Sequence, residues 1–260
     1  MKIVLIGAGR VATALALALR EQGHDILKII SRTAGKAASL AAMLGCEYAD
    51  KADIPAETEV VIIAVNDDAL GDVLAEMKYG GTPVVAHTAG SVGLEVFENS
   101  KPARHGVFYP LQTFTHGREY DFSSIPLFIE ANNKHSKAIL EALASSLSTK
   151  VFYLDSEKRK YLHLAAVFAC NFVNHMYHSG KEITAMAGMD FNVLLPLLRE
   201  TMNKAADMGP ERSQTGPAVR NDKNTIEKHL DLLSFSPDLQ KIYRVMTDSI
   251  INSYRDSLNG

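Results

Sequence analysis

Polar residues that could act on a substrate recur along one side of a predicted helix over residues 156–186. His163, Asn171 and His178 follow one another there at intervals close to whole helical turns, in an otherwise apolar stretch. Because imidazole titrates near neutrality, His163 could supply a proton during catalysis, and Asn171 could hydrogen-bond the reacting group. For His175 and His178 we favour a solvated surface, and since no carboxylate accompanies them we predict no metal ligands.

A second set of candidate residues lies in the loop 215–222 and the helix after it. Arg220 could hold a carboxylate through two parallel hydrogen bonds, and His229 follows within the next helix. An ion pair between domains or subunits is an alternative role for Arg220. We predict that His163, Asn171, Arg220 and His229 form the catalytic and substrate-binding set.

The glycines near the amino terminus predict a dinucleotide site. An apolar strand over 2–6 runs into a turn that opens a helix rich in Ala and Leu. Gly7 permits a sharp reversal, Gly9 a close approach of pyrophosphate to the backbone, and Ala12 close packing of helix on strand. The helix amino terminus would present free N–H groups to phosphate. The predicted contacts here are Gly7, Gly9, Arg10, Val11 and Ala12.

The residues after the second strand, 25–30, favour NADP over NAD. An NAD enzyme usually carries an acid at this place for the ribose hydroxyls, whereas this chain has Ser31, Arg32 and Thr33. A guanidinium flanked by two hydroxyls suits a 2′-phosphate. Arg32 in place of an acid also disfavours an S-adenosylmethionine enzyme.

Further cofactor contacts are expected where two later strands end. The strands over 60–65 and 83–86 lead into segments that would converge on the same groove. The predicted contacts are Val65, Asn66, Asp67, His87 and Ser91. For His87 the alternative is a structural role at the end of its strand.

The elements that position these residues alternate between strand and helix up to residue 154. Such alternation predicts an α/β fold, a right-handed, doubly wound, mostly parallel Rossmann sheet. The predicted strands are 2–6, 25–30, 47–49, 60–65, 83–86, 105–108, 126–130 and 151–154, and the helices between them 12–19, 34–44, 69–77 and 134–147.

Beyond residue 155 the periodicity is helical throughout. We expect helices over 156–186, 192–206, 224–233 and 237–258, with Ser236 capping the last one ahead of Pro237. The prediction is a dinucleotide-binding domain, 1–154, followed by an all-α domain, 155–260, for substrate binding and dimerisation.

Composition narrows the class of protein. The 260 residues are 47% hydrophobic and 22% charged with a net charge of −3, which is typical of a globular protein and carries no basic signal for nucleic acid. Cys46 and Cys170 are too few and too far apart for a disulfide framework or a zinc cluster. With no run of signal-peptide or membrane length, a cytoplasmic protein is expected.

Several motifs together resemble a known family. The first half is similar to the NADP-binding domain of the pyrroline-5-carboxylate reductase and 6-phosphogluconate dehydrogenase superfamily. The whole chain resembles bacterial Rossmann-like oxidoreductases with a helical carboxyl-terminal domain of unknown function. The motifs are Gly7 to Ala12, His87 to Ser91, Tyr109 to Phe114, His163 to Ala166 with Asn171, and Thr215 to His229. The resemblance implies an NADP-linked reductase, often a dimer.

The chain departs from its relatives at three places. Tyr109 stands where relatives often have histidine before Pro-Leu, and Asn221 stands where they have glycine. The hydroxyacid dehydrogenases of the superfamily carry a catalytic lysine four residues before the helix asparagine, where this chain has Val167. Another group must then donate the proton, and His163 is our candidate.

The sequence therefore predicts an NADP-dependent reductase that transfers hydride to a small C=O or C=N compound, with Arg220 favouring an anionic one. The alternative is an NADP-binding sensor or scaffold without turnover, which the missing lysine keeps open. Apolar residues around 193–198 predict a homodimer, because a few helices on one domain leave such faces to cover.

Overall fold

The computed structural model describes residues 1–100 and 102–254, which fall into two compact units divided after Asn171. Strands end at Tyr153, where the change to helices was expected, but the start of the long helix packs with the first unit. Across the described residues, no helix is both long enough and apolar enough to cross a membrane.

The first unit is built on an eight-stranded sheet in the order β10-β9-β8-β7-β5-β1-β2-β3. Every neighbouring pair is parallel except β8 with β9, so the predicted mostly parallel, doubly wound sheet is confirmed. Its strands are β1 Lys2–Ile6, β2 Asp25–Ile30, β3 Glu47–Ala49, β5 Val60–Ile63, β7 Val84–His87, β8 His105–Pro110, β9 Leu127–Ala131 and β10 Val151–Tyr153.

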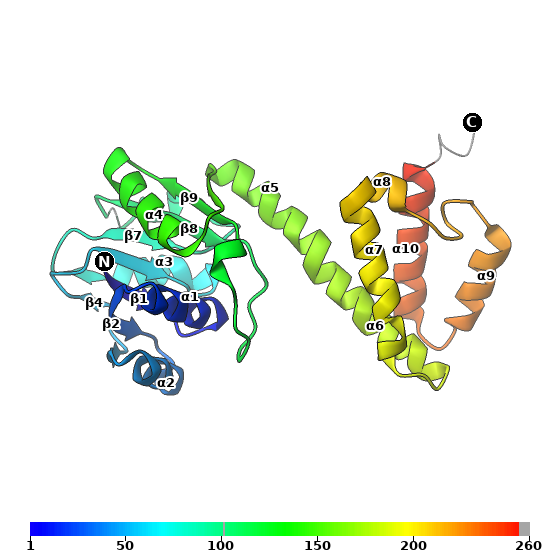
Figure 1. The fold of residues 1–260 in the computed structure, drawn as a ribbon, viewed down its shortest axis with the longest axis horizontal. Coiled ribbons are helices and arrows are strands. Elements are labelled where there is room, and N and C mark those ends of the chain that lie inside the picture. The colour runs from blue at the N-terminus through cyan, green and yellow to red at the C-terminus, as the bar shows by residue number, and fades with distance from the viewer. Residues whose placement is uncertain (101, 255–260) are drawn as a thin grey trace. The chain divides into compact units, whose positions relative to one another are not determined.

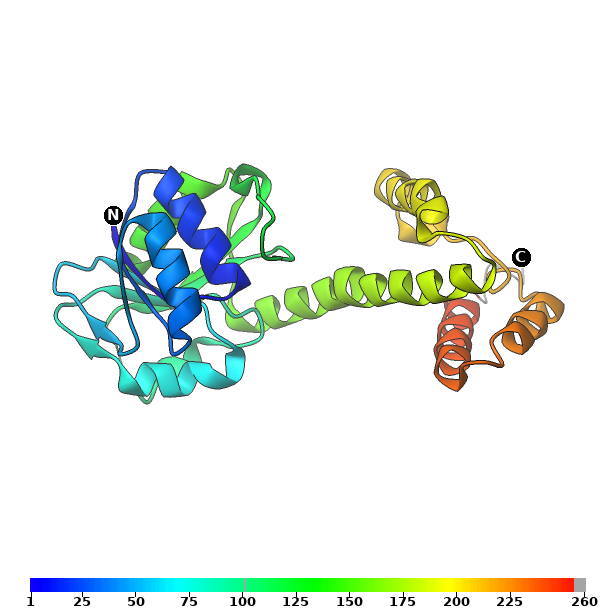
Figure 2. The ribbon, with the colours of Figure 1, turned by 90° about the horizontal axis from the view of Figure 1, so that it is seen from below.

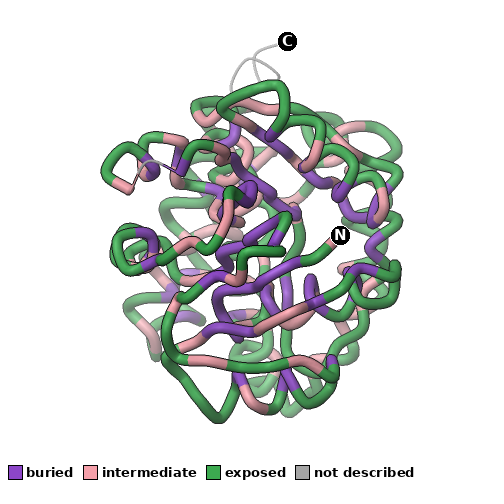
Figure 3. The backbone as a smooth tube through the Cα atoms, turned by 90° about the vertical axis from the view of Figure 1, so that its left-hand side faces the viewer, coloured by how far each residue is buried: buried purple, intermediate pink, exposed green. Residues whose placement is uncertain are grey.

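Helices cover both faces of this sheet (Figures 1 and 2). On one face, Leu15, Leu40 and Leu140 join the sheet residues in one core. On the other face Leu70 and Leu74 pack against the opposite side chains of the strands. These residues belong to α1 Arg10–Glu21, α2 Ala34–Leu44, α4 Lys134–Leu147 and α3 Leu70–Glu76. The central strands β1, β5 and β7 are buried almost throughout, as a sheet covered on both faces requires, and Figure 3 shows the chain coloured by the burial of each residue.

The small elements of the first unit are the ones that the sequence did not predict. A second sheet pairs β4 Asp53–Ile54 with β6 Lys78–Tyr79. Two residues cannot show an alternating pattern, so neither strand had a signal. Single 3₁₀ turns lie at Asp67–Ala69, Leu94–Phe97 and Phe122–Ser124.

The long helix predicted over 156–186 is present but is not uniform. It consists of α5 Ser156–Ala166, a π-helical segment Val167–Phe172 and α6 Val173–Met186. The Asp155 side chain accepts a hydrogen bond from the Lys158 N–H at 2.9 Å, which explains why the helix begins there.

Within residues 172–254 of the second unit there are helices and no strands. Ser236 caps the last helix as predicted, by accepting from the Leu239 N–H. That helix ends at Ser253, and the predicted continuation over 255–258 lies outside the described residues. After α6 the elements are a 3₁₀ turn Phe191–Leu194, α7 Leu195–Met208, α8 Pro210–Ser213, α9 Lys223–Leu232 and α10 Pro237–Ser253.

Candidate functional site

The candidate site lies at one edge of the sheet, where parallel strands end side by side. Ile6 of β1 pairs with Ile63 of β5, which pairs with His87 of β7. β8 continues this row in parallel, since His87 pairs with Val107. The glycine turn, the segment after β5, the segment after β7 and Tyr109 near the end of β8 therefore share the carboxyl edge, where ligands bind in open α/β sheets.

A cavity of about 330 Å³ opens at the glycine turn. Gly7 has φ +116°, and a Cβ there would come within 2.2 Å of the Ala64 carbonyl oxygen, so only glycine fits. At Gly9 a Cβ would meet nothing within 4 Å, so the chain is open on that side. The predicted residues that line the cavity are Gly7, Gly9, Ser31, Arg32, Thr33, Val65 and Asn66.

The start of α1 fits a pyrophosphate. The helix begins at Arg10 and no side chain caps its first turn, so that turn's N–H groups have no side-chain acceptor. Ala12 is fully buried, as expected for close packing of helix on sheet. Arg10, Val11 and Ala12 themselves are not among the side chains that line the cavity.

Two cations in the lining suit a 2′-phosphate. Besides Arg32, flanked by Ser31 and Thr33, the cavity contains Lys36. We did not predict Lys36, which lies in the first turn of α2, close after Arg32 in the sequence. The lining also carries acids, Asp50, Asp72 and Glu76, so the cavity is not uniformly positive.

Asp67 and Ser91 connect two of the converging segments. The Ser91 hydroxyl donates a hydrogen bond to the Asp67 carboxylate, which ties the segment after β7 to the segment after β5. Neither residue lines the cavity at the glycine turn. Their contact with cofactor stays a prediction, while their contact with each other is structural.

His87 has a structural place. Its side chain is fully buried and stacks on Phe97 with ring centroids 5.6 Å apart, and its Nδ1 accepts from the Ala89 N–H at 3.2 Å. Burial, assisted by the nearby Arg159 charge, lowers the pKa of His87 to about 3, so the ring is neutral. This arrangement matches a strand-end role, because a fully buried ring does not line the groove.

A second cavity at the same edge contains the helix candidates. It has a volume of about 420 Å³, and its lining includes Tyr109, His163 and Asn171 together with Gln112, Thr113 and Cys170. The Tyr109 hydroxyl lies 3.0 Å from Nδ1 of His163. The structure thus brings His163 and Asn171 to one cavity and adds Tyr109, which the sequence analysis named within a family motif and as a departure from the relatives, but not as a site residue.

The π-helical segment explains how Asn171 reaches the cavity of His163. In a regular α-helix the eight residues from His163 to Asn171 make about 2.2 turns, so the two side chains would point in different directions around the helix axis. The wider π-helical turn over residues 167–172 rotates less per residue, so Asn171 lies on nearly the same side of the helix as His163. π-helical segments inside α-helices are frequent at functional sites.

A buried ion pair holds the start of α5 to the sheet. Arg159, 1% exposed, pairs with the carboxylate of Glu130 on β9. Arg159 also donates to the Val92 carbonyl at 2.6 Å, and Ser156 donates to both oxygens of Glu130. Because Arg159 lies one turn before His163, this network fixes the helix that presents the imidazole.

Arg220 and His229 belong to the second unit. Arg220 is exposed, and His229 Nδ1 lies 2.8 Å from the Tyr243 hydroxyl. Asn221 has φ 49°, a left-handed conformation that asparagine tolerates, so it can replace the glycine of the relatives. Asp222 caps α9 by accepting from the Thr225 N–H. The substrate-binding roles of Arg220 and His229 stay predictions.

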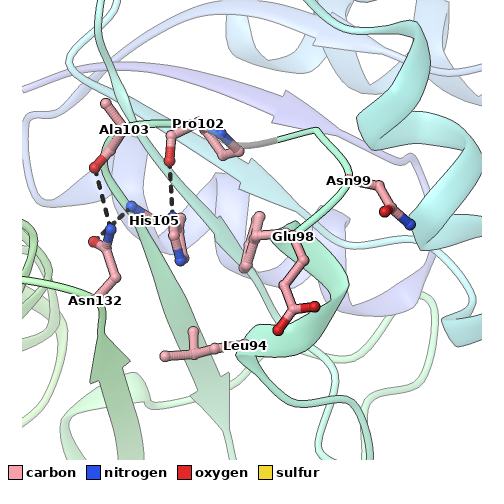
Figure 4. A pocket seen from close by; sticks show the side chains of 8 residues that line it. Leu94, Glu98, Asn99, Pro102, Ala103, His105 and Asn132 are labelled. Atoms are coloured by element: carbon pink, nitrogen blue, oxygen red, sulfur yellow. Dashed lines mark hydrogen bonds between the residues drawn. The ribbon is translucent and has the colours of Figure 1, made fainter.

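One further hollow lies at the opposite edge of the sheet and differs in chemistry (Figure 4). His105 begins β8 and Asn132 follows the antiparallel β9, so both stand at the amino ends of the parallel strands. Nδ1 of His105 is hydrogen-bonded to the Pro102 carbonyl at 2.8 Å, and the Asn132 amide donates a hydrogen bond to the Ala103 carbonyl. These polar side chains hold the loop that precedes β8. The residues that line this cavity include no glycine turn.

The fold and the glycine-turn cavity define a Rossmann-type nucleotide-binding protein. Residues 2–90 match a family model described as NADP oxidoreductase, coenzyme F420-dependent, and residues 125–250 match a domain of unknown function, DUF2520. A crystal structure described as a candidate NADP oxidoreductase, BF3122 from Bacteroides fragilis, is 43% identical, with 96% of this chain and 98% of that one covered at a TM-score of 0.91. The chain therefore belongs to the family of NADP oxidoreductases that carry a DUF2520 domain.

More distant structures share the fold alone. Protein TM1727 from Thermotoga maritima is 24% identical with a TM-score of 0.80, covering 99% of this chain and 100% of that one. A reductive aminase from Aspergillus terreus, in complex with NADPH and ethyl-5-oxohexanoate, is 16% identical with a TM-score of 0.73, covering 97% and 94%. No curated protein matches the chain.

Proposed function

We propose that this protein is an NADPH-dependent reductase of a small C=O or C=N compound. The observation that carries the proposal is the neighbourhood of two cavities on one sheet edge, one at the glycine turn with Arg32 and Lys36, the other with Tyr109, His163 and Asn171. The likeness in fold to a reductive aminase that binds NADPH and a keto ester supports this substrate class.

The residues divide the work by their chemistry. Gly7, Gly9 and the start of α1 would hold the pyrophosphate, and Ser31, Arg32 and Thr33 the 2′-phosphate. NADPH, when bound, supplies the hydride. As the substrate heteroatom gains the electron pair of its double bond, His163 and Asn171 would polarise it by hydrogen bonds, and its proton would come from water. Arg220 and His229 would bind an anionic group of the substrate.

We also propose that the protein works as a homodimer. In the second unit Leu197, Met202 and Met246 lie on helices and are half or more exposed. Apolar side chains in such number on one small helical unit favour a partner surface of the same kind. A second copy would cover them.

The second candidate function is an NADP-binding sensor without turnover. Its supporting observation is Val167, one turn before Asn171, where dehydrogenases of the superfamily carry lysine. The open space of about 420 Å³ beside His163 favours the enzyme, because a sensor has no need of a substrate cavity there.

Calorimetric titration with NADPH and with NADH tests the cofactor. We expect NADPH to bind more tightly, and Arg32→Ala to weaken NADPH about 10–100-fold with little effect on NADH, since a hydrogen bond to a charged group contributes about 1.5–3 kcal/mol. The exposed Arg118 provides the control Arg118→Ala. Equal weakening for both nucleotides would remove the argument for NADP, and no binding of either would remove the reductase and the sensor together.

Turnover tests the chemistry. Loss of NADPH absorbance with a keto acid or a cyclic imine would establish reduction. His163→Ala should lower the rate about 10²–10³-fold while NADPH binding stays unchanged. His175→Ala, an exposed histidine on α6, should leave the rate as it is. An unchanged rate in His163→Ala would exclude His163 as the donor.

A further inference from the structure

The pair formed by Tyr109 and His163 has a feature that follows from counting donors and acceptors. The hydroxyl of Tyr109 has one hydrogen to donate, and its hydrogen-bond partner among the described residues is Nδ1 of His163, at 3.0 Å. Tyr109 is only 8% exposed, so a hydroxyl hydrogen without an acceptor would be costly. The arrangement is satisfied when the phenol donates to Nδ1.

The phenol is held in its protonated form. Burial is the largest influence and raises the pKa of Tyr109 to about 12, with Asp67 adding to the rise and Arg159 opposing it. Tyr109 is therefore a hydroxyl donor at any pH where the protein would work.

The pair is packed too closely to rearrange freely. A Cβ at Gly90 would lie 2.5 Å from Nδ1 of His163 and 2.9 Å from Cζ of Tyr109, so the backbone after β7 covers the hydrogen bond. The rings meet edge to face with centroids 6.0 Å apart. One turn before His163, Arg159 holds α5 to the sheet through Glu130 and the Val92 carbonyl.

The imidazole then has one nitrogen left. With Nδ1 accepting from Tyr109, the proton of the neutral ring must reside on Nε2. Nε2 has no hydrogen-bond partner among residues 1–100 and 102–254, and the His163 side chain lines the cavity of about 420 Å³. In this arrangement the hydrogen-bond donor available to the cavity is the Nε2–H group of His163.

We propose that Tyr109 is a positioning residue that fixes His163 as its Nε2–H tautomer, so that the ring presents a hydrogen-bond donor to the heteroatom of the substrate. This inference rests on the proposed reductase function for its purpose. It concerns the tautomer in the protein before reaction and includes no covalent step. It also gives Gly90 a role, since only glycine allows the covering segment to lie so close.

Nitrogen NMR of protein labelled with ¹⁵N-histidine tests the tautomer without any substrate. The His163 signals are assigned by their loss in His163→Asn. We expect Nε2 to be protonated and Nδ1 unprotonated in the full chain, and Tyr109→Phe to move both ¹⁵N shifts toward a mixture of tautomers. Tyr153→Phe, which removes an exposed hydroxyl with a longer bond of 3.4 Å to Ala131, is the matched control and should change neither shift.

A kinetic readout separates positioning from substrate binding. With a keto acid that the wild-type protein reduces, Tyr109→Phe should lower kcat about 2–10-fold with KM unchanged, in line with loss of one neutral hydrogen bond. A protonated Nδ1 in the wild-type spectrum, or unchanged ¹⁵N shifts in Tyr109→Phe, would overturn the inference. If no keto acid or cyclic imine is reduced, the proposed function fails, and the NMR result still decides the tautomer.

Discussion

The two units differ in how far each covers its own apolar side chains. In the first unit the strands and their covering helices bury whole side chains, such as Ile3, Leu15 and Leu140, at 0% exposure. In the described part of the second unit the fully covered residues are few, and Phe235, Val245 and Leu197 are about half exposed or more. The helices that connect the strands cover both faces of the sheet. A few amphipathic helices without a sheet, in contrast, leave apolar faces that only another surface can cover.

Substitutions in the two units should therefore have different consequences. The first unit contains the cavities and the buried ion pair, so substitutions there act through folding and chemistry within the unit. The second unit contains mainly uncovered faces, so substitutions there should act through association.

The largest effect is expected from the buried pair of the first unit. Glu130→Ala would leave the Arg159 charge buried without its carboxylate, which costs about 3–5 kcal/mol in the free energy of unfolding. Denaturant unfolding of the variant measures the loss. Glu157→Ala removes an exposed carboxylate that pairs with Lys160, and should cost about 1 kcal/mol or less. Equal losses in the two variants would contradict a buried, essential pair.

The next largest effect is expected from acid pH, which should lower the free energy of unfolding through protonation of His87. Its folded pKa, about 3, lies below the usual 6.5, so the unfolded chain binds a proton first as pH falls. Stability is therefore complete above pH 6.5 and is lost progressively toward pH 3, by up to several kcal/mol. In His87→Gln the free energy of unfolding should fall less between neutral and acid pH. The exposed His135→Gln is the control, and an unaltered pH dependence in His87→Gln would exclude this histidine as the cause.

The smallest effect on folding and the clearest on association is expected from the second unit. Leu197→Glu places a charge on an exposed apolar face of α7 and should weaken dimerisation about 10–100-fold, since burial of a leucine contributes about 1.5–3 kcal/mol. Sedimentation or light scattering over a concentration series measures it. Met43→Glu makes the same change on the exposed side of α2 in the first unit and should not alter association. A wild-type protein that stays monomeric would show that the uncovered faces of the second unit are not a dimer interface.

Much of the fold could be predicted because its long elements carry strong local signals. The bounds of β2, β3, α2 and α4 agree with the predictions, since each combines hydrophobic periodicity with turn residues at its ends. The antiparallel direction of β9 was not foreseen, because strand direction depends on the course of the connection and not on the strand's own residues. The turn α8 has four residues, too few for a helical period.

The candidate site was predicted in part. The glycine turn, Arg32 and the helix residues His163 and Asn171 were found from motif and spacing, and the structure places them on two cavities. Tyr109 was visible within a family motif and as a substitution there, but its contact with His163 was not, because nothing local shows that a residue at the end of β8 meets a residue of α5. His87 carries the polar side chain that a groove would use, yet it lies inside the fold.

The alternation of strands and helices, the glycine turn and the place of Arg32 after β2 follow from the sequence, since these depend on residues close together in the chain. Which distant residues meet depends on tertiary packing. Glu130 with Arg159, Tyr109 with His163, and Gly90 above that pair are contacts between separate elements. They exist because packing of the helix start on the sheet selects one register among many, and no local pattern encodes that selection.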